Sequence, residues 1–324
     1  LMGEDDFVRV MTRSSQLSSI ASRAFDPLGL LTDLRSFARH GAFASLVSME
    51  SLAAVKHCNA DHQLIEFLSH PVQLVRRHAT WLLGRRMPSK AAFGPLVDQL
   101  SVGGIDSMHA LRTLRRWSTT SPAAIKAHLS GALESTNDAH LRGRLIDAIG
   151  SIEQSSELLV RVAADPEEAL TARIAAIGAL GEQTDANSHL TLERLASADD
   201  VISLYAWVAL GDLATVKLPP TPRKGAGLRI AQLVLTAGLD GQLSRGGLGD
   251  TGGVASLLVS LGEALAHHRD VDHVLTIGRG TLEDSLTTSS VSTDSALTYA
   301  MIAVGDYGRA AETPDSAWEH LPSI

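Results

Sequence analysis

The segment GDTGG, residues 249 to 253, has the residue types of a binding site for a phosphate group or for sugar oxygens. The Thr251 hydroxyl can cap a following helix, while Gly252 and Gly253 leave the first-turn N–H groups uncovered by side chains. A helix N-terminus carries a partial positive charge and outward-pointing N–H donors, which together attract anions. We therefore expect Thr251, Gly252 and Gly253 to bind substrate.

Three charged residues near this segment each have two interpretations. Asp250 would repel a phosphate at close range, so in contact with substrate it would accept hydrogen bonds from sugar hydroxyls; capping the helix is an equal alternative. Arg245 and Arg279 are expected in loops that follow strands, where they can reach an anionic substrate; the alternative is a solvated arginine without a role. No catalytic residue is identified.

Other kinds of site are not indicated. His57 and Cys58 with His62, and the pair His267-His268, lack the spacing that directs two ligands to one ion, so no metal is expected. Cys58 is expected to be buried in a helix rich in alanine and valine. The sequence contains no G-x-S-x-G, Walker or paired-carboxylate motif, and we expect no cofactor.

The elements around the glycine pair follow the order strand, loop, helix, strand. Residues 228 to 238 form an apolar run typical of a strand buried on both faces of a parallel sheet, and a helix is expected from Val254 to His268. Two further strands are expected at 271–278 and 296–305. The leucines expected on the buried face of the helix are Leu257, Leu258, Leu261 and Leu265. This order predicts the opening unit of a Rossmann-like fold, without the G-x-G-x-x-G fingerprint of dinucleotide binding.

Residues 244 to 253, SRGGLGDTGG, followed by a leucine-rich helix, resemble the N-terminal glycine loop of retaining GT-B glycosyltransferases. The resemblance is greatest to sucrose synthases and sucrose-phosphate synthases, whose loop reads D-T-G-G-Q; Val254 stands at the position of that glutamine. It covers about residues 228 to 305. It implies that the glycine pair contacts an acceptor sugar or the phosphate of a nucleotide-sugar donor, at an active site between two Rossmann domains.

A domain of that size is one half of such an enzyme, because roughly 100 residues make a single domain. We therefore expect residues 228 to 324 to be a truncated N-terminal domain, the chain to be a fragment, and the chain as given to be catalytically inactive.

A repeat of about 31 residues, the length of two short helices with two turns, precedes this part. The equivalent positions, separated by 31, 35, 31 and 30 residues, are Gly84, Arg115, Gly150, Gly181 and Gly211. We expect Gly150, Gly181 and Gly211 to lie where neighbouring helices pack closely. The residues expected to cap the second helix of a repeat are His70, Asp138, Asp165 and Asp199-Asp200.

Residues 165 to 181, DPEEALTARIAAIGALG, resemble HEAT repeats, including the short bacterial kind. The resemblance implies a right-handed α-solenoid that binds a partner protein. We assign an N-terminal segment to residues 1–25, the HEAT-like repeats to 26–216 and a Pro/Gly linker to 217–227.

Seven arginines cluster in the first two clear repeats: Arg76, Arg77, Arg85, Arg86, Arg112, Arg115 and Arg116. The last turns of two adjacent helices would align Arg85-Arg86 with Arg115-Arg116 in a basic ridge. The simpler interpretation is that cations near helix C-termini are favoured by the helix dipole. The alternative is an anionic partner, or docking of the acidic second part of the chain.

Composition limits the remaining possibilities. Residues 1 to 224 carry 23 basic and 24 acidic side chains and residues 225 to 324 carry 5 and 12, so neither part has the positive field that nucleic-acid binding needs. The single cysteine favours a reducing compartment, and no apolar run is long enough to span a membrane. We expect a cytoplasmic protein without membrane contact: a glycosyltransferase fragment with a repeat scaffold or, alternatively, a non-enzymatic HEAT-repeat adaptor.

Overall fold

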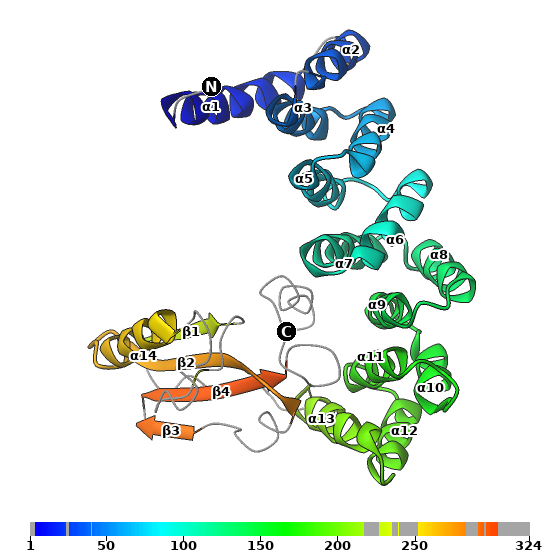
Figure 1. Cartoon of the computed structure of the whole chain (residues 1–324), viewed down its shortest axis with the longest axis vertical. Helices are drawn as coiled ribbons and strands as arrows, with labels where there is room; N and C mark the ends of the chain where they lie inside the picture. The colour runs from blue at the N-terminus through cyan, green and yellow to red at the C-terminus, as the bar shows by residue number, and fades with distance from the viewer. Residues whose placement is uncertain are drawn as a thin grey trace. The chain divides into compact units, whose positions relative to one another are not determined.

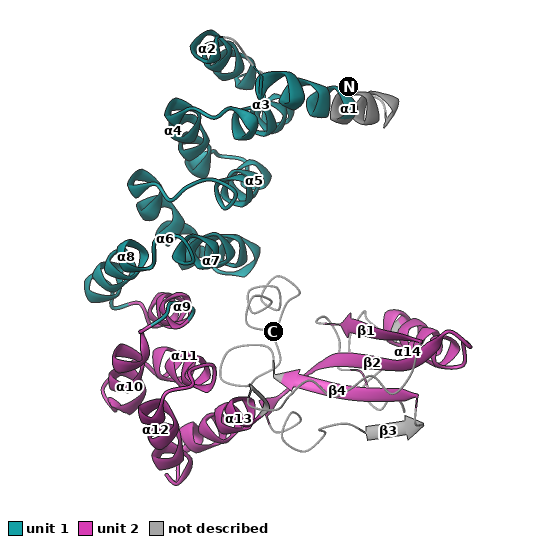
Figure 2. Ribbon diagram, turned by 180° about the vertical axis from the view of Figure 1, so that it is seen from behind, with its two compact units in different colours: residues 1–137, 151–153 teal, residues 138–150, 154–324 magenta. Residues whose placement is uncertain are grey.

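The protein is a region of packed helices followed by a small α/β unit (Figure 1). The chain divides into two compact units, residues 1–137 with 151–153, and residues 138–150 with 154–324 (Figure 2). The computed structural model describes residues 4–23, 26–39, 41–216, 227–234, 239, 252–282, 291–294 and 296–303.

The first unit contains helices packed in pairs. Its α-helices are α1 (Glu4–Ala21), α2 (Pro27–Ala38), α3 (Ala42–Ala54), α4 (Cys58–Glu66), α5 (Gln73–Leu83), α6 (Phe93–Val102), α7 (Gly104–Ser118) and α8 (Pro122–Ser135). Helices α2, α4 and α6 each pack against the helix that follows, while α3, α5 and α7 form a continuous row. Helix α1, in the segment that we expected to precede the repeats, packs on α3 at the end of this row.

The second unit continues with the same local pattern. Its helices before the sheet are α9 (Ala139–Gly150), α10 (Ser156–Ala164), α11 (Leu170–Gly181), α12 (Ala186–Ala196) and α13 (Val201–Val216). Helix α11 packs between α9 and α13, and α10 and α12 pack against the helices that follow them. The predicted region of packed helices is confirmed.

Close helix packing explains two of the three glycines for which we expected it. A Cβ atom on Gly150 would meet the Cβ of Ala179, and one on Gly181 would lie 3.0 Å from the Cα and the carbonyl oxygen of Ala209. Gly211 is different, because its added Cβ would have no neighbour within 4 Å. The prediction for Gly211 is wrong: this glycine faces outward on α13.

Side-chain donors also tie each repeat to the preceding one. The Thr113 hydroxyl donates to the Thr80 carbonyl (2.9 Å), and Gln183 Nε2 donates to the Gly150 carbonyl (3.2 Å). The indole of Trp117 donates to the carbonyls of Leu83 (3.2 Å) and Arg86 (2.9 Å). The carbonyls of Thr80 and Leu83 also accept from the backbone N–H groups of Gly84 (3.2 Å) and Arg86 (2.8 Å), so the side chains of α7 add a second donor to each.

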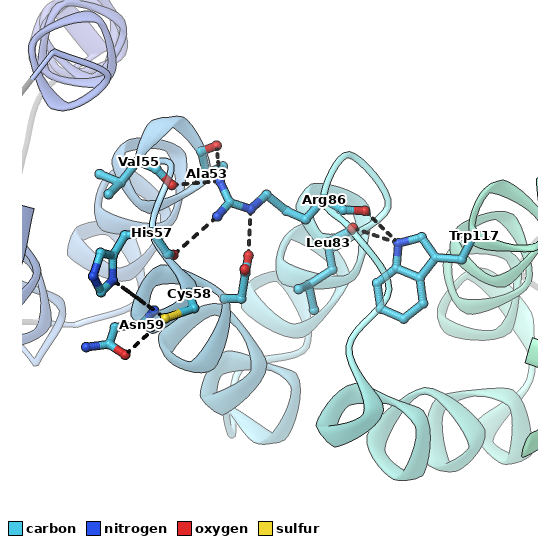
Figure 3. A network of polar contacts seen from close by, with 9 residues as sticks. Ala53, Val55, His57, Cys58, Asn59, Leu83, Arg86 and Trp117 are labelled. Carbon is cyan, nitrogen blue, oxygen red and sulfur yellow. Dashed lines mark hydrogen bonds and ion pairs between the residues drawn. The ribbon is translucent and has the colours of Figure 1, made fainter. Parts of the chain in front are cut away.

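Arg86 is part of this framework and does not belong to an exposed ridge (Figure 3). Its guanidinium donates to Asp61 Oδ1 (2.6 Å) and to the carbonyls of Ala53 (3.0 Å) and Val55 (2.8 Å), which lie at the end of α3. The predicted ridge of Arg85-Arg86 and Arg115-Arg116 is therefore wrong for Arg86, whereas Arg85 and Arg116 line one cavity. The half-buried carboxylate of Asp61 and the carbonyls at the end of α3 hold the Arg86 guanidinium, and these partners lie too far away in the chain to be read from its local sequence.

Two of the predicted helix caps form. The carboxylates of Asp138 and Asp200 each accept a hydrogen bond from the backbone N–H three residues on, at 2.7 and 3.2 Å. The prediction is wrong for Asp165, whose carboxylate stabilises a turn while α11 begins only at Leu170. It is also wrong for His70, which accepts from Val72 N in the turn before α5.

The α/β unit contains a four-stranded sheet in the order β1-β2-β4-β3. Strands β1 (Leu228–Val234), β2 (Val271–Gly280) and β4 (Leu297–Ala303) are parallel, and β3 (Val291–Asp294) pairs with β4 antiparallel at the edge. Helix α14 (Gly252–Ala266) connects β1 to β2. The three predicted strands and the helix are confirmed, whereas β3 was not predicted.

Two burial expectations in this unit are wrong. Strand β1 lies at the edge of the sheet, and Leu228 (63% exposed) and Leu233 (45%) are not covered on both faces. On α14, Leu257 (65%) and Leu261 (44%) are exposed, and Ala255 is buried in their place. The helix is apolar around most of its circumference, so periodicity could not select the buried face.

Candidate functional site

The first candidate site is the N-terminal end of α14, which the sheet core holds in place. A short connection joins the last residue of α14 to Val271, the first residue of β2, so the C-terminus of the helix lies near the start of this strand. The N-terminus of the helix therefore lies toward the carboxyl edge of the parallel strands. The core between the helix and the sheet contains Ala255 and Val259 of α14 together with Leu239, Val274, Leu297 and Tyr299. The carboxyl edge of a parallel sheet is where ligands bind in open α/β folds.

Two close contacts set the positions of α14 and of Leu239 against the sheet. The Thr276 hydroxyl donates to Gln232 Oε1 (2.8 Å), and a Cβ on Gly262 would lie 3.2 Å from that same oxygen, so the helix sits close on the sheet here. At the carboxyl end of β2, a Cβ on Gly278 would lie 2.9 Å from the Leu239 nitrogen. The absence of that side chain lets Leu239 lie against β2.

The glycine pair opens α14, as predicted. The helix begins at Gly252, and Gly253 occupies its first turn, exposed to solvent. A Cβ on Gly253 would have no neighbour within 4 Å, and its φ is not in the left-handed region. Neither packing nor backbone conformation therefore requires glycine at this position. The predicted site residues Thr251, Asp250 and Arg245 lie outside the described residues.

Arg279 lies inside β2, one residue before its end, and not in the loop where we expected it. Side chains alternate along a strand, and Val274 and Thr276 face α14, so Arg279 points to the opposite face. Burial lowers the pKa of its guanidinium. The structure thus brings Gly252 and Gly253 together, and it puts Arg279 at the same sheet edge on the other face.

The second candidate site is a cavity of about 180 Å³ between α5 and α7. The residues that line it are Trp81, Gly84, Arg85, His109, Arg112, Thr113 and Arg116. The guanidinium of Arg85 lies 5.4 Å from the ring centroid of Trp81. The three arginines belong to the cluster predicted from the sequence, whereas Trp81 and His109 were not predicted. Helical spacing could have identified both residues. Trp81 precedes Arg85 by four residues and His109 precedes Arg112 by three, and residues at these spacings are neighbours on a helix.

The nearby carboxylates already have basic partners. Asp106 Oδ2 accepts from Arg77 Nη2 (2.9 Å) and from Gln73 Nε2 (2.7 Å). Glu50 lies 2.9 Å from His78 Nε2, and this hydrogen bond lowers the pKa of Glu50. These two acids form no ion pair with the arginines of the cavity in the described structure, although the nearby charge of Arg85 also lowers the pKa of Glu50.

The described residues contain no group of three or more His, Cys, Asp or Glu side chains that could hold a metal ion. Cys58 is exposed at the first residue of α4, with its Sγ 3.7 Å from Asn59 Oδ1 and 4.0 Å from His57 Nδ1 (Figure 3). The expectation of a buried cysteine is wrong, because Cys58 begins a helix and does not lie within one. Among the helices that the structure describes, none is long and apolar enough to cross a membrane.

These features define the class of protein: a region of packed helices followed by a small parallel α/β unit. No protein-family model matches the chain, and no curated protein matches it.

Proposed function

We propose that this chain combines a HEAT-like α-solenoid with the N-terminal, Rossmann-like part of a retaining GT-B glycosyltransferase. Such an enzyme transfers a hexosyl group from a nucleotide sugar to a small acceptor. In this proposal Gly252 and Gly253, with Thr251 and Asp250 before them, contact the acceptor sugar or the donor phosphate, and Arg245 and Arg279 are further anion contacts. The sequence SRGGLGDTGG is the basis of the comparison.

The observation that carries the proposal is the exposed first turn of α14. A glycine within a helix costs about 1 kcal/mol relative to alanine, and at Gly253 no neighbouring atom compensates for this cost. The glycine pair follows a parallel strand and opens the helix that returns to the next strand, and its N–H groups are suited to phosphate or sugar oxygens. A bare first turn leaves room for a ligand to approach the backbone.

The HEAT assignment is supported by the helical pairs and by the contacts between successive pairs. In α9, α11 and α13 the repeats approach at Gly150 and Gly181, and the Gln183 side chain bonds across repeats to the Gly150 carbonyl. Each repeat packs mainly on its neighbours, as in solenoid proteins, which use the resulting surface to bind partners.

The test is calorimetric titration of the full chain with UDP-glucose and with ADP-glucose. We expect one of the two to bind saturably, and Gly253→Leu to weaken that binding at least about tenfold, because the side chain blocks the backbone donors. The leucine has open space and improves helix propensity, so this variant should fold normally.

Gly94→Leu is the matched control. Gly94 also lies in the first turn of a helix, α6, and its Cβ position is equally open. Its replacement should leave nucleotide-sugar binding within about twofold, which is below 0.5 kcal/mol. Absence of binding by either nucleotide sugar, or equal binding by wild type and Gly253→Leu, contradicts the glycosyltransferase proposal.

A non-enzymatic adaptor is the second candidate, and the arginine-lined cavity between α5 and α7 favours it. An adaptor would bind its partner through the helical repeats and would not require a ligand at α14. Titration separates the two candidates, because only the first predicts a nucleotide-sugar complex that Gly253→Leu disrupts.

A further inference from the structure

The cavity between α5 and α7 has an unbalanced charge. Arg112 and Arg116 lie on the same face of α7, one turn apart, and Arg85 reaches the cavity from the end of α5. All three are exposed, and within the described part of the chain none of them donates to a carboxylate. Like charges held close together destabilise a folded protein unless an anion or solvent screens them.

The framework around the cavity keeps these cations in place. Gly84 lies so close to α7 that an added Cβ would be 2.9 Å from the Thr113 hydroxyl, and that hydroxyl donates to the Thr80 carbonyl (2.9 Å). Trp117 fixes the end of α5 by donating to the carbonyls of Leu83 and Arg86. The two helices that carry the arginines are thus joined at several points, and a ligand would meet a preformed site.

A polar atom in the cavity wall also lacks a partner. His109 Nδ1 is buried without a hydrogen-bond partner in the described structure, next to the arginines on α7. A buried ring nitrogen usually has a partner, which can be supplied by a ligand or by water. In the tautomer that carries its proton on Nδ1, His109 adds a fourth donor to those of Arg85, Arg112 and Arg116.

The size and the donor set select the ligand chemistry. Clefts for drug-sized ligands measure roughly 300 to 1,000 Å³, so a cavity of about 180 Å³ suits a compact group. A carboxylate has two oxygens and accepts one guanidinium fork, whereas a phosphomonoester has three terminal oxygens and a charge of about −1.5 to −2. Three arginines therefore match a phosphate better, and the Trp81 ring offers an apolar wall to the group that carries it.

We propose that the cavity lined by Arg85, Arg112 and Arg116 binds the phosphate group of a phosphomonoester. A small metabolite and a phosphorylated side chain of a partner protein both present this group, and the experiment below distinguishes these two sources. This site belongs to the first unit and does not depend on the glycine pair of α14.

The experiment is calorimetric titration of the full chain at fixed ionic strength. The probes are inorganic phosphate, glucose 6-phosphate and a phosphoserine peptide, with hexaglutamate as the carboxylate probe. We expect saturable binding of all three phosphate probes, weakened at least about tenfold by Arg112→Gln and by Arg116→Gln. Both side chains are exposed, so the variants should keep the wild-type melting temperature. Tighter binding of glucose 6-phosphate than of inorganic phosphate identifies a small metabolite as the source of the phosphate, and tighter binding of the phosphoserine peptide identifies a partner protein.

Arg39→Gln is the matched control, because Arg39 is an exposed arginine in the same unit, and its replacement removes the same charge. It should change phosphate affinity less than about twofold. Three results overturn the proposal: no saturable binding of any phosphate probe, equal weakening by Arg39→Gln, or binding of hexaglutamate alone, which would assign the cavity to acidic peptides. UDP-glucose binding lost in Gly253→Leu but kept in Arg112→Gln shows that the two sites are separate.

Discussion

Gly181 and Gly253 represent two different reasons for a glycine in a helix. Gly181 is buried where α11 meets α13, and a Cβ would lie 3.0 Å from the backbone of Ala209. Gly253 is exposed, with open space around it. Gly94 and Gly178 are equally open, so the proposed ligand site depends on the place of Gly253 in the first turn of the helix that follows β1.

His109 should titrate below the ordinary histidine value of about 6.5. Burial lowers its pKa first, then the charges of Arg112 and Arg77 and a smaller effect of His78, while Asp106 raises it. In Arg112→Gln one repulsive charge is gone, so the pKa of His109 should rise toward 6.5. Long-range ¹H–¹⁵N spectra recorded against pH measure this directly.

The control for this titration is Arg39→Gln, a change of the same charge for which no effect on His109 is expected, since Arg39 does not contribute to its pKa. A His109 pKa that stays the same or falls in Arg112→Gln would show that Arg112 does not act on the cavity as we describe.

Glu168 should make the stability of the second unit depend on pH. Two hydrogen bonds from Arg142, at 2.6 and 2.5 Å, hold the pKa of Glu168 below its ordinary value. A lowered carboxyl pKa stabilises the fold above the unfolded value of about 4.3, and this contribution is lost as pH falls through the folded pKa. Glu168→Gln should cost about 1.5 to 3 kcal/mol at pH 7 and progressively less below pH 4.

Urea unfolding followed by circular dichroism between pH 3 and pH 7 tests this prediction. Glu167→Gln is the control, because Glu167 is an exposed carboxylate at the adjacent position. Its stability curve should run parallel to the wild-type curve. A stability difference between Glu168→Gln and wild type that stays constant from pH 7 to pH 3 would be inconsistent with the proposed linkage.

The pairing of helices was predictable from the sequence because apolar spacing and a recurring glycine both record the repeat. Long-range hydrogen bonds have no such local signal. Arg86 lies among arginines in the sequence but bonds to Asp61 and to carbonyls of α3, about 30 residues away. The buried face of α14 was missed for a related reason, since its apolar residues surround most of the helix.

Helix α11 provides a matched pair of glycines that tests the packing account. Gly181→Ala should destabilise the protein by about 1 to 3 kcal/mol, because the new methyl group meets the Ala209 backbone. Gly178→Ala, three residues earlier on the same helix, is open and exposed, and should stabilise it by up to about 1 kcal/mol. Thermal unfolding measures the change in stability of each variant. An equal change in the two variants would contradict the role of Gly181 in helix packing.

On the scale of the whole molecule, the two units and the chain of neighbouring contacts make the structure modular. The sequence predicted a helical part before an α/β part, because periodicity and composition change near residue 217. It predicted the glycine pair at the start of α14 from local signals. It did not predict on which face of the sheet Arg279 lies, because strand ends and register are set by pairing with β4.

In a modular structure, a destabilising substitution is expected to affect only the helices close to it. Gly181→Ala should reduce hydrogen-exchange protection in α11 and α13 and leave α5 and α7 unchanged, because a repeat array transmits strain mainly to adjacent repeats. Exchange followed by mass spectrometry measures each helix separately. Equal loss of protection in α5 would mean that the described helices unfold as one cooperative block.

The account depends above all on a ligand at the first turn of α14, and selective ¹⁵N-glycine labelling observes that turn directly. The measurement is a ¹H–¹⁵N TROSY titration of the full chain with UDP-glucose. We predict that the Gly253 amide resonance shifts saturably while the Gly94 resonance, from the first turn of α6, stays in place. An unmoved Gly253 resonance at saturating UDP-glucose, or shifts confined to glycines of the helical repeats, would contradict the proposed sugar-nucleotide site.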